Sequence, residues 1–342
     1  MDKPLKFPSE LRFDLVSKDW VVIATGRAKR PETFRKEKRY DEEISEAACP
    51  FCKIETQEKP VLVFAEGKKA ALTDGIPASW TTVVIPNKYP AFLPSFELNT
   101  RIEGNLYQTM NAVGFHEVVV TRDHRKSLAL LSLERVKEVF NVYQERYLQL
   151  MDENFVNYIS IFHNHGKEAG ASIFHPHSQI ITTPLIDSDL KKSLANAQRY
   201  FRENKKCVYC AMDEWEIQSK VRVIFENDEF LAVCPFASKT AFEVIVSPKQ
   251  HLPYFEKITE KEKWLLAEAF QVALKKLYTG LNDPAYNFYL HTAPCDGKNY
   301  NFYHWHWTIL PKTATQAGFE MGTQMEISTI EPEQAAEFLR KR

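Results

Sequence analysis

The chain has 342 residues, of which 44% are hydrophobic and 26% are charged, a composition typical of a globular protein with a sizeable core and about two domains. Its 44 Lys and Arg residues balance 45 Asp and Glu residues, which argues against a general nucleic-acid-binding surface. No apolar run approaches the ~18 residues of a membrane span, and the first residues do not resemble a signal peptide. We therefore expect a cytoplasmic enzyme.

The first half of the chain predicts several strands and one long helix. The β-branched run Glu117–Thr121 is typical of a buried strand, and Ser132 can cap the helix that follows it. Tyr158–Phe162 reads as a strand that leads into a glycine-containing loop, and Ser178–Thr183 reads as the last strand of this half. These elements form a mainly antiparallel sheet with one helix.

The second half repeats this order. Glu243–Ser247 reads as a strand, and Thr259 begins a capping box for a long helix. The strands Asn287–Leu290 and Trp307–Leu310 come next. A helix near Asp189–Glu203 is expected to link the halves, and another at Pro332–Lys341 to close the chain. We predict an α+β fold of two tandem units, residues 1–186 and 187–342, arranged as a pseudo-dimer.

Cysteines and histidines occur in the same order in both halves. A C-x-x-C pair is followed by a lone histidine and then by a His-x-His pair, and the last spacing is almost the same, from 124 to 175 and from 251 to 304. Two thiolates and two imidazoles suit a closed, structural tetrahedral zinc site. The candidate ligands are Cys49, Cys52, His124 and His175 in the first half, and Cys207, Cys210, His251 and His304 in the second.

Two alternatives to this metal assignment stay open. A redox C-x-x-C should open a helix, and neither pair is followed by a convincing helix start. His291 could also join His304 and His306 at a different metal, which would compete with the second cysteine-containing set. His116, His163 and His165 are interpreted as ordinary core residues.

The segment His175-Pro-His177-Ser178-Gln179 is the strongest candidate for chemistry. In an extended strand, alternate residues share one face, so His175, His177 and Gln179 can point into one site. One histidine can then bind metal while the other reacts. The preceding loop, which contains Gly170 and Ser172, can bring small polar donors close to an anion.

The motif Asn164-x-Gly166…Gly170-x-Ser172-x-x-His175-Pro-His177-x-Gln179 resembles that of the galactose-1-phosphate uridylyltransferase family, a branch of the histidine-triad superfamily. The chain is also similar to the ADP-glucose phosphorylase branch, which likewise has a cysteine pair in its second half. The resemblance implies ping-pong nucleotidyl transfer with His177 as the nucleophile. It also implies that the family's dimeric state is possible for this chain.

The resemblance assigns further roles to individual residues. Ser172 matches a phosphate contact and Glu320 a contact to hexose hydroxyls. An amide at position 179, where the wider superfamily often has a third histidine, favours transfer to phosphates over hydrolysis. The matched nucleotide- and substrate-binding set is Arg27, Arg30, Asn87, Asn164, Gly170, Ser172, Gln179 and Glu320.

The sequence leaves three functions open. The first is a UDP-glucose–hexose-1-phosphate uridylyltransferase that acts through uridylyl-His177 on a nucleoside-diphosphate sugar and a sugar 1-phosphate. The second is a phosphorylase that uses the same nucleotidyl-histidine on ADP-glucose or a dinucleotide. The third is a zinc-stapled nucleic-acid-binding protein, which the balanced charge disfavours. His306 takes the place of His177 in the second half, but Trp307-Thr308 replaces Ser178-Gln179 there, so we expect that half to be inactive.

Overall fold

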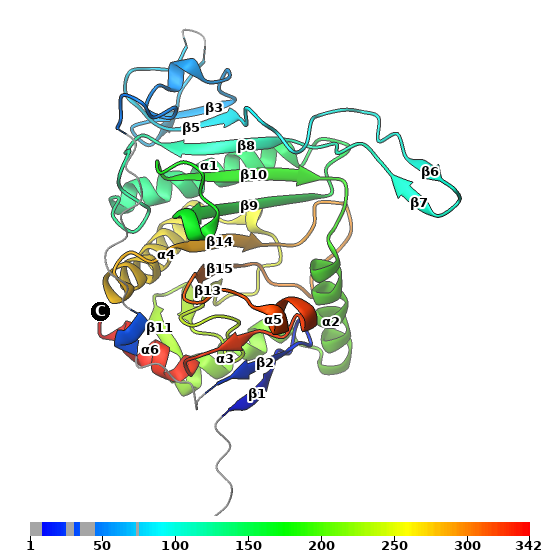
Figure 1. Ribbon diagram of the computed structural model, residues 1–342, viewed down its shortest axis with the longest axis vertical. Coiled ribbons are helices and arrows are strands. Elements are labelled where there is room, and N and C mark those ends of the chain that lie inside the picture. Colours follow the sequence, from blue (N-terminus) through cyan, green and yellow to red (C-terminus); the bar gives the residue numbers. More distant parts are fainter. Residues whose placement is uncertain (1–8, 25–30, 35–44, 73–74) are drawn as a thin grey trace, which may run out of the picture.

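The computed structural model describes residues 9–24, 31–34, 45–72 and 75–342. Its centre is an antiparallel sheet of eleven strands. Figure 1 shows the sheet running through the molecule. In spatial order the strands are β11 (Val223–Glu226), β12 (Phe230–Val233), β13 (Val244–Pro248), β15 (His306–Pro311), β14 (Tyr286–His291), β9 (Tyr158–His165), β10 (His177–Thr183), β8 (His116–Thr121), β5 (Trp80–Pro86), β3 (Leu62–Ala65) and β4 (Lys68–Lys69).

The two halves of the chain meet at the centre of this sheet. β9 of the first half pairs with β14 of the second, with Asn164 opposite Asn287 and His163 opposite Phe288. Outward from this seam the strands follow in equivalent order on each side. β10 and then β8 lie beyond β9, and β15 and then β13 lie beyond β14. The predicted α+β fold of two tandem units is therefore confirmed, and the units share one continuous sheet.

Two long helices cover one face of the sheet side by side, α1 (Leu133–Leu150) and α4 (Glu260–Leu281) (Figure 1). The capping box predicted for α4 is present, because Thr259 accepts from the backbone of Glu262 and the Glu262 carboxylate accepts from the backbone of Thr259. The apolar faces of both helices meet aromatic side chains of the sheet. Phe140, Phe270 and Trp307 form mutual edge contacts with ring centroids 5.4–5.6 Å apart, which gives this layer a fixed packing.

The remaining helices lie mostly around the second unit. They are α2 (Ser188–Asn204), α3 (Val208–Ser219), α5 (Gly318–Thr323) and α6 (Pro332–Arg340), with short 3₁₀ helices at Pro31–Phe34, Ile54–Thr56, Lys167–Ala169 and Phe255–Lys257. The helix α3 corrects one expectation, because Cys207 is its N-cap residue. The second C-x-x-C pair therefore does open a helix, which the sequence pattern did not reveal because α3 has little amphipathic periodicity.

Two small sheets complete the fold. β1 (Glu10–Phe13), β2 (Trp20–Ile23) and β16 (Ile327–Ser328) form one of them. The hairpin β6 (Arg101–Glu103) and β7 (Tyr107–Thr109) forms the other and projects away from the main sheet (Figure 1). Every residue of these two short strands is exposed.

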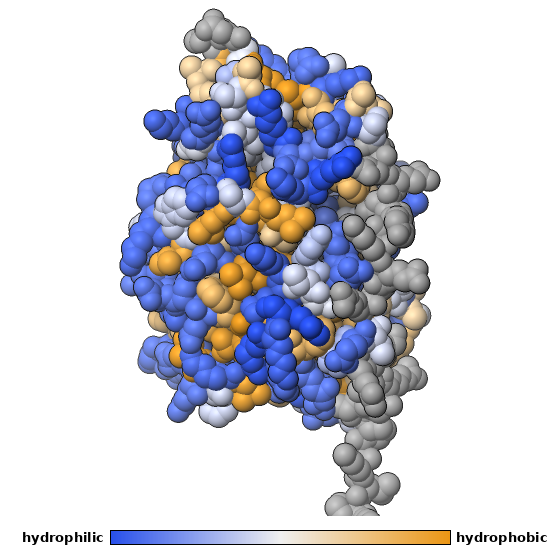
Figure 2. All heavy atoms as spheres, turned by 90° about the vertical axis from the view of Figure 1, so that its left-hand side faces the viewer, coloured by the Kyte–Doolittle hydropathy of each residue, from blue (hydrophilic) through white to orange (hydrophobic). Residues whose placement is uncertain are grey.

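The surface on the left-hand side of Figure 1 is largely hydrophilic, with an interrupted band of apolar side chains near its middle (Figure 2). Scattered apolar patches of this kind are ordinary for a globular protein. Within the described ranges, no helix combines the length and the apolarity that crossing a membrane requires.

Candidate active site and metal clusters

The side chains of β10 alternate between the two faces of the sheet. Ser178 and Ile180 point toward the helix layer, where Ser178 Oγ lies 2.5 Å from the hydroxyl of Tyr143 on α1. Because successive residues of a strand face opposite ways, His177 and Gln179 point to the other face, away from α1 and α4. The structure thus places both side chains on one face of the sheet, and His175 lies two residues before the strand begins.

One ring nitrogen of His177 has a defined partner. Nδ1 lies 2.9 Å from the backbone oxygen of His175, and a carbonyl oxygen only accepts, so Nδ1 carries the proton. The lone pair of the neutral ring is therefore on Nε2. Burial lowers the pKa of His177, against the opposing effect of the His175 carbonyl. This favours the neutral, nucleophilic form near pH 7.

Phe51 holds the His177 ring from one side. It lies between the two cysteines of the first C-x-x-C pair, and its ring centroid is 5.0 Å from that of His177 in an edge-on contact. The same ring lies 5.8 Å from His175. Phe51 belongs to an apolar cluster with Val118 and Val120 of β8, so the cysteine-containing loop packs directly beside the candidate nucleophile.

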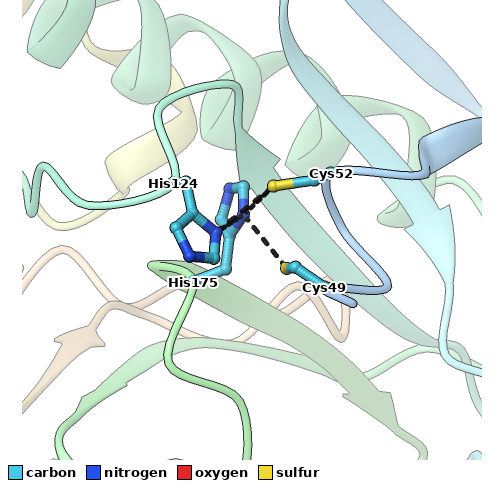
Figure 3. Close-up of side chains that lie close together, drawn as sticks. All are labelled: Cys49, Cys52, His124 and His175. Carbon is cyan, nitrogen blue, oxygen red and sulfur yellow. Dashed lines mark hydrogen bonds between the residues drawn. The ribbon is translucent and has the colours of Figure 1, made fainter. Parts of the chain in front are cut away.

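The first predicted ligand set is brought together. Figure 3 shows the side chains of Cys49, Cys52, His124 and His175 directed at a common centre. His175 Nδ1 lies 3.5 Å from both sulfur atoms and 3.3 Å from His124 Nδ1. Its Nε2 is 2.7 Å from the backbone oxygen of Thr121 and donates to it. The lone pair of Nδ1 therefore faces the centre, as in a metal-binding histidine whose other nitrogen is held by a hydrogen bond.

The second set forms an equivalent cluster of Cys207, Cys210, His251 and His304. Cys210 Sγ lies 3.3 Å from His251 Nδ1 and 3.5 Å from His304 Nδ1. His304 Nε2 donates to the backbone oxygen of Pro248 at 2.9 Å. Both nitrogens of His304 are thus committed, which rules against the alternative metal site with His291 and His306. The ligand atoms of each cluster lie within 4.8 Å of one another, and two thiols with two imidazoles fit a tetrahedral metal ion.

A cavity of about 510 Å³ reaches the first cluster. Cys52 and His124 form part of its wall, together with Arg122, Lys126 and Arg135. The centre of the first cluster is therefore less deeply enclosed on this side than on the side of Cys49, which is 1% exposed.

The loop between β9 and β10 has the backbone that its glycines predict. Gly170 has φ +87°, which a residue with a Cβ rarely adopts. Asn164 lies beside it, and a Cβ at position 170 would be 3.9 Å from Asn164 Nδ2. The oxygen of Asn164 accepts a hydrogen bond from Asn287 Nδ2 at 2.8 Å. Asn287 was not among the predicted site residues, because nothing in its local sequence marks it.

Asn87 and Gln179 share His116 as a neighbour, a residue that the sequence pattern assigns to the core. His116 Nε2 lies 2.8 Å from Gln179 Oε1 and 3.1 Å from Asn87 Nδ2. In the register of β8 and β10, Gln179 lies opposite Val118, and His116 lies opposite Ile181. His116 is thus on the same face as Gln179 and His177. Its alternation with Val118 and Val120 is the signal that could have identified it.

Other predicted residues are not brought to His177 by a described contact. Ser172 is exposed in the loop. Glu320 lies on α5, where its carboxylate accepts from the backbone N–H of Ala317 at 3.0 Å. In Figure 1, α5 lies below β13 and β15, whereas β10 lies above them. Arg27 and Arg30 lie outside the described residues, so their predicted phosphate contacts stay predictions.

The second unit repeats the geometry around the nucleophile's position. His306 Nδ1 lies 3.3 Å from the backbone oxygen of His304, the counterpart of the contact between His177 and His175. His291 stacks on His306 with ring centroids 4.7 Å apart, and Thr308 is buried where Gln179 faces the candidate site. His291 stacks on the histidine here and a threonine replaces the amide, so the two units differ in the side chains around this histidine.

The fold and the clusters define a two-unit α+β protein in which a buried histidine, His177, lies beside a Cys₂His₂ cluster. The Galactose-1-phosphate uridyl transferase N-terminal domain model matches residues 5–186, and the corresponding C-terminal domain model matches residues 193–341. The chain belongs to the galactose-1-phosphate uridyl transferase family.

Named relatives fall into two groups. An ADP-glucose phosphorylase of Arabidopsis thaliana is 32% identical, over 97% of this chain and 92% of the relative. A galactose-1-phosphate uridylyltransferase of Thermotoga maritima is 28% identical, over 97% of this chain and 98% of the relative. The crystal structure of an Arabidopsis thaliana ADP-glucose phosphorylase with bound ADP-glucose superimposes with a TM-score of 0.79 at 28% identity, covering 98% of this chain and 99% of the other.

Proposed function

We propose that this protein transfers a nucleoside monophosphate from a nucleoside-diphosphate sugar to a second phosphate through a covalent bond to His177. The observation that carries the proposal is the hydrogen bond between His177 Nδ1 and the His175 carbonyl. It leaves a lone pair on Nε2 of a neutral ring, on the face of the sheet where Gln179 also points. A positioned neutral imidazole is an effective nucleophile toward an activated phosphate.

The transfer takes place in two steps. In the first, the Nε2 lone pair forms a bond to the α-phosphorus, and the bond from phosphorus to the bridging oxygen breaks. The electron pair leaves with the sugar 1-phosphate, which is a weak base and needs little protonation. In the second step, an oxygen of the acceptor phosphate attacks the same phosphorus, and the electron pair of the P–N bond returns to Nε2.

The neighbouring residues support these steps by positioning. Phe51 limits the rotation of the His177 ring, and the His175 carbonyl stabilises the positive charge that the ring acquires on reaction. Gln179 can donate from its amide to a non-bridging phosphate oxygen but cannot shuttle a proton. This combination favours phosphate acceptors over water.

We infer that the donor is UDP-glucose and the acceptor a hexose 1-phosphate, so that the protein is a UDP-glucose–hexose-1-phosphate uridylyltransferase. Most of the named relatives are uridylyltransferases. The second candidate is an ADP-glucose phosphorylase with inorganic phosphate as the acceptor. It is favoured by the 32% identity to the Arabidopsis thaliana enzyme and by the TM-score of 0.79 with its ADP-glucose complex.

One experiment tests the chemistry and separates the two donors. The protein is incubated with UDP-glucose or ADP-glucose without an acceptor, and its intact mass is measured. A UMP adduct supports the uridylyltransferase and an AMP adduct the phosphorylase. The adduct should be absent in His177→Ala and should disappear when galactose 1-phosphate or inorganic phosphate, respectively, is added. If the wild-type protein forms neither adduct, the proposed function is wrong.

We infer that zinc occupies both Cys₂His₂ clusters. The donor set and the hydrogen bonds from His175 and His304 to backbone carbonyls support this assignment. The ion would fix the cysteine-containing loop and hence Phe51, with no vacant position for a reactant. Metal analysis of the purified protein, Cys49→Ser and Cys207→Ser should show two, one and one equivalents of zinc.

We infer that two copies of the chain associate through the segment 89–109, which includes the hairpin β6–β7. This segment carries large apolar side chains that are exposed, with Phe96 89% and Leu106 80% accessible. An isolated two-stranded hairpin is only marginally stable in water, and a concentrated apolar surface usually has a partner. Light scattering should report a dimer for the wild type and a monomer for Leu106→Asp.

A further inference from the structure

We propose that His116 is a positioning residue that orients the side-chain amide of Gln179 so that its N–H groups face the phosphate at His177. The inference rests on the proposed nucleotidyl transfer and extends it to a residue that touches no substrate. The relevant geometry is a chain of two hydrogen bonds, from the backbone of Ala91 to His116 and from His116 to Gln179.

The direction of this chain is determined at its first link. The backbone N–H of Ala91 points at His116 Nδ1 at 3.1 Å, and a backbone N–H can only donate. His116 Nδ1 must therefore be the unprotonated nitrogen. A neutral imidazole then carries its proton on Nε2, which becomes a donor. The adjacent Nδ2 of Asn87, 3.1 Å away, is also a donor, so it forms no hydrogen bond with Nε2.

The second link determines the orientation of Gln179. The protonated Nε2 of His116 lies 2.8 Å from the side chain of Gln179, and only an oxygen can accept there. The two ends of an amide are hard to distinguish by shape, but this hydrogen bond requires Oε1 to face His116. The NH₂ group then points the other way, and it makes no hydrogen bond to any residue that the structure describes.

This orientation determines what a phosphate would meet. Gln179 lies two residues after His177 on the same face of β10, about 7 Å along the strand, a separation that a phosphoryl group with its oxygens can span. An NH₂ group at that place donates to a non-bridging oxygen, whereas the reversed amide would present an oxygen to an anion. The correct orientation stabilises the charge of the transferring group, and the reversed one destabilises it.

The position of His116 explains why it can hold this orientation. It begins β8, next to β10, with its ring on the same face as Gln179. Its backbone oxygen also accepts from the N–H of Asn87 at 2.8 Å. The turn after β5 therefore forms hydrogen bonds with both the backbone and the ring of His116. Ala91 belongs to the same turn, so the acceptor nitrogen of the ring is held by backbone that does not depend on any side chain.

The test compares two substitutions of His116 that differ in whether they keep a hydrogen-bond donor. His116→Phe keeps an aromatic ring but has no donor, whereas His116→Gln keeps an N–H group within reach of Gln179 Oε1. We expect kcat/KM for transfer from the nucleotide adduct to fall about ten- to a hundredfold in His116→Phe. This is the range expected when the single hydrogen bond from Gln179 to the charged phosphate is lost. His116→Gln should recover most of that loss. Both variants should keep wild-type zinc content.

A double-mutant cycle separates positioning from a general structural role. In a Gln179→Ala background, His116→Phe should cause no further loss, because the amide that it orients is gone. Equal losses in the two backgrounds would overturn the proposal, as would wild-type activity of His116→Phe.

The tautomer can be measured without any reaction. In ¹⁵N-histidine-labelled protein, the resonances that are absent from His116→Gln should show an unprotonated Nδ1 and a protonated Nε2. The opposite tautomer would overturn the proposal. This measurement remains valid if the wild type forms no nucleotide adduct. That result would contradict the proposed function but not the orientation of Gln179 by His116.

Discussion

Asn287 and Asn164 face each other across the seam between the two units, and Asn287 Nδ2 donates to Asn164 Oδ1 at 2.8 Å. The same Nδ2 lies 2.8 Å from the backbone oxygen of Ala169 in the loop before His177. A strand of the second unit therefore holds both a candidate nucleotide-binding amide and the loop next to it. The Nδ2 group of Asn164 lies beside Gly170, 3.9 Å from the place that a Cβ at position 170 would take.

We predict that Asn287→Ala lowers kcat/KM for nucleotidyl transfer about tenfold, mainly through KM. The substitution removes two hydrogen bonds, each with a net value of about 1 kcal/mol, and leaves the amide of Asn164 free to rotate. Steady-state kinetics with varied donor measures the effect. Asn204→Ala is the matched control, since it loses one hydrogen bond to the backbone of Tyr200 at the end of α2. Unchanged kinetics in Asn287→Ala would mean that the second unit is only a scaffold for the first.

Much of this arrangement could be predicted from local sequence signals. The repeated C-x-x-C, His and His-x-His order correctly predicted both clusters, because three ligands of each cluster come from short motifs and the lone histidine recurs at nearly the same spacing in both halves. The alternation of strand residues correctly placed His177 and Gln179 on one face. The capping box at Thr259 and Glu262 marked the beginning of α4 for the same local reason.

The features that could not be predicted depend on contacts between distant segments. Asn287 is one of several polar residues in its half, and only the pairing of β14 with β9 brings it to Asn164. The sequence around His116 indicates only that it belongs to a strand. Its role depends on the turn that places Ala91 against its ring. The helix after Cys207 is stabilised by packing and has no apolar stripe, so its sequence lacks the periodicity that would predict a helix.

The metal cluster and the nucleophile should be separable by mutation. Cys49→Ser is expected to remove the ion of the first cluster and to lower the free energy of unfolding by on the order of 4 kcal/mol, since loss of a structural metal is among the largest single-site effects. His177→Ala should abolish the nucleotide adduct and keep the metal. Chemical denaturation, metal analysis and intact mass test this. A similar loss of stability in both variants would contradict the division of roles.

Phe51 links these two parts, because its ring contacts His177 with centroids 5.0 Å apart. We expect Phe51→Ala to slow adduct formation about tenfold, since a freer imidazole spends less time aligned with phosphorus. The same change should lower the free energy of unfolding by about 3 kcal/mol, as expected for a buried aromatic side chain. Phe51→Leu retains part of the contact and should be intermediate in single-turnover kinetics. If Phe51→Ala lost metal in proportion to its activity, the effect would come from the cluster rather than from the ring contact.

We expect Glu243 to make the stability of the second unit depend on pH. This residue directly precedes β13 and is 5% exposed. Burial raises the pKa of its carboxyl group to about 7 from 4.5, although the backbone N–H of Lys239 donates to it and opposes the shift. Between pH 4.5 and about pH 7, the carboxyl group of Glu243 therefore binds its proton more fully in the folded protein than in the unfolded chain.

The sign of the effect follows from this difference. The free energy of unfolding should receive the full contribution below about pH 4.5 and lose it as the pH rises through about 7, by at most about 3 kcal/mol. Glu243→Gln keeps an oxygen that accepts from Lys239 but cannot ionise. The difference between wild-type and Glu243→Gln stability, measured by denaturant unfolding from pH 5 to 8, should therefore grow in favour of the variant as the pH rises. Parallel stability curves for the two proteins would show that the carboxylate is stabilised in the folded state to the same degree as in the unfolded chain.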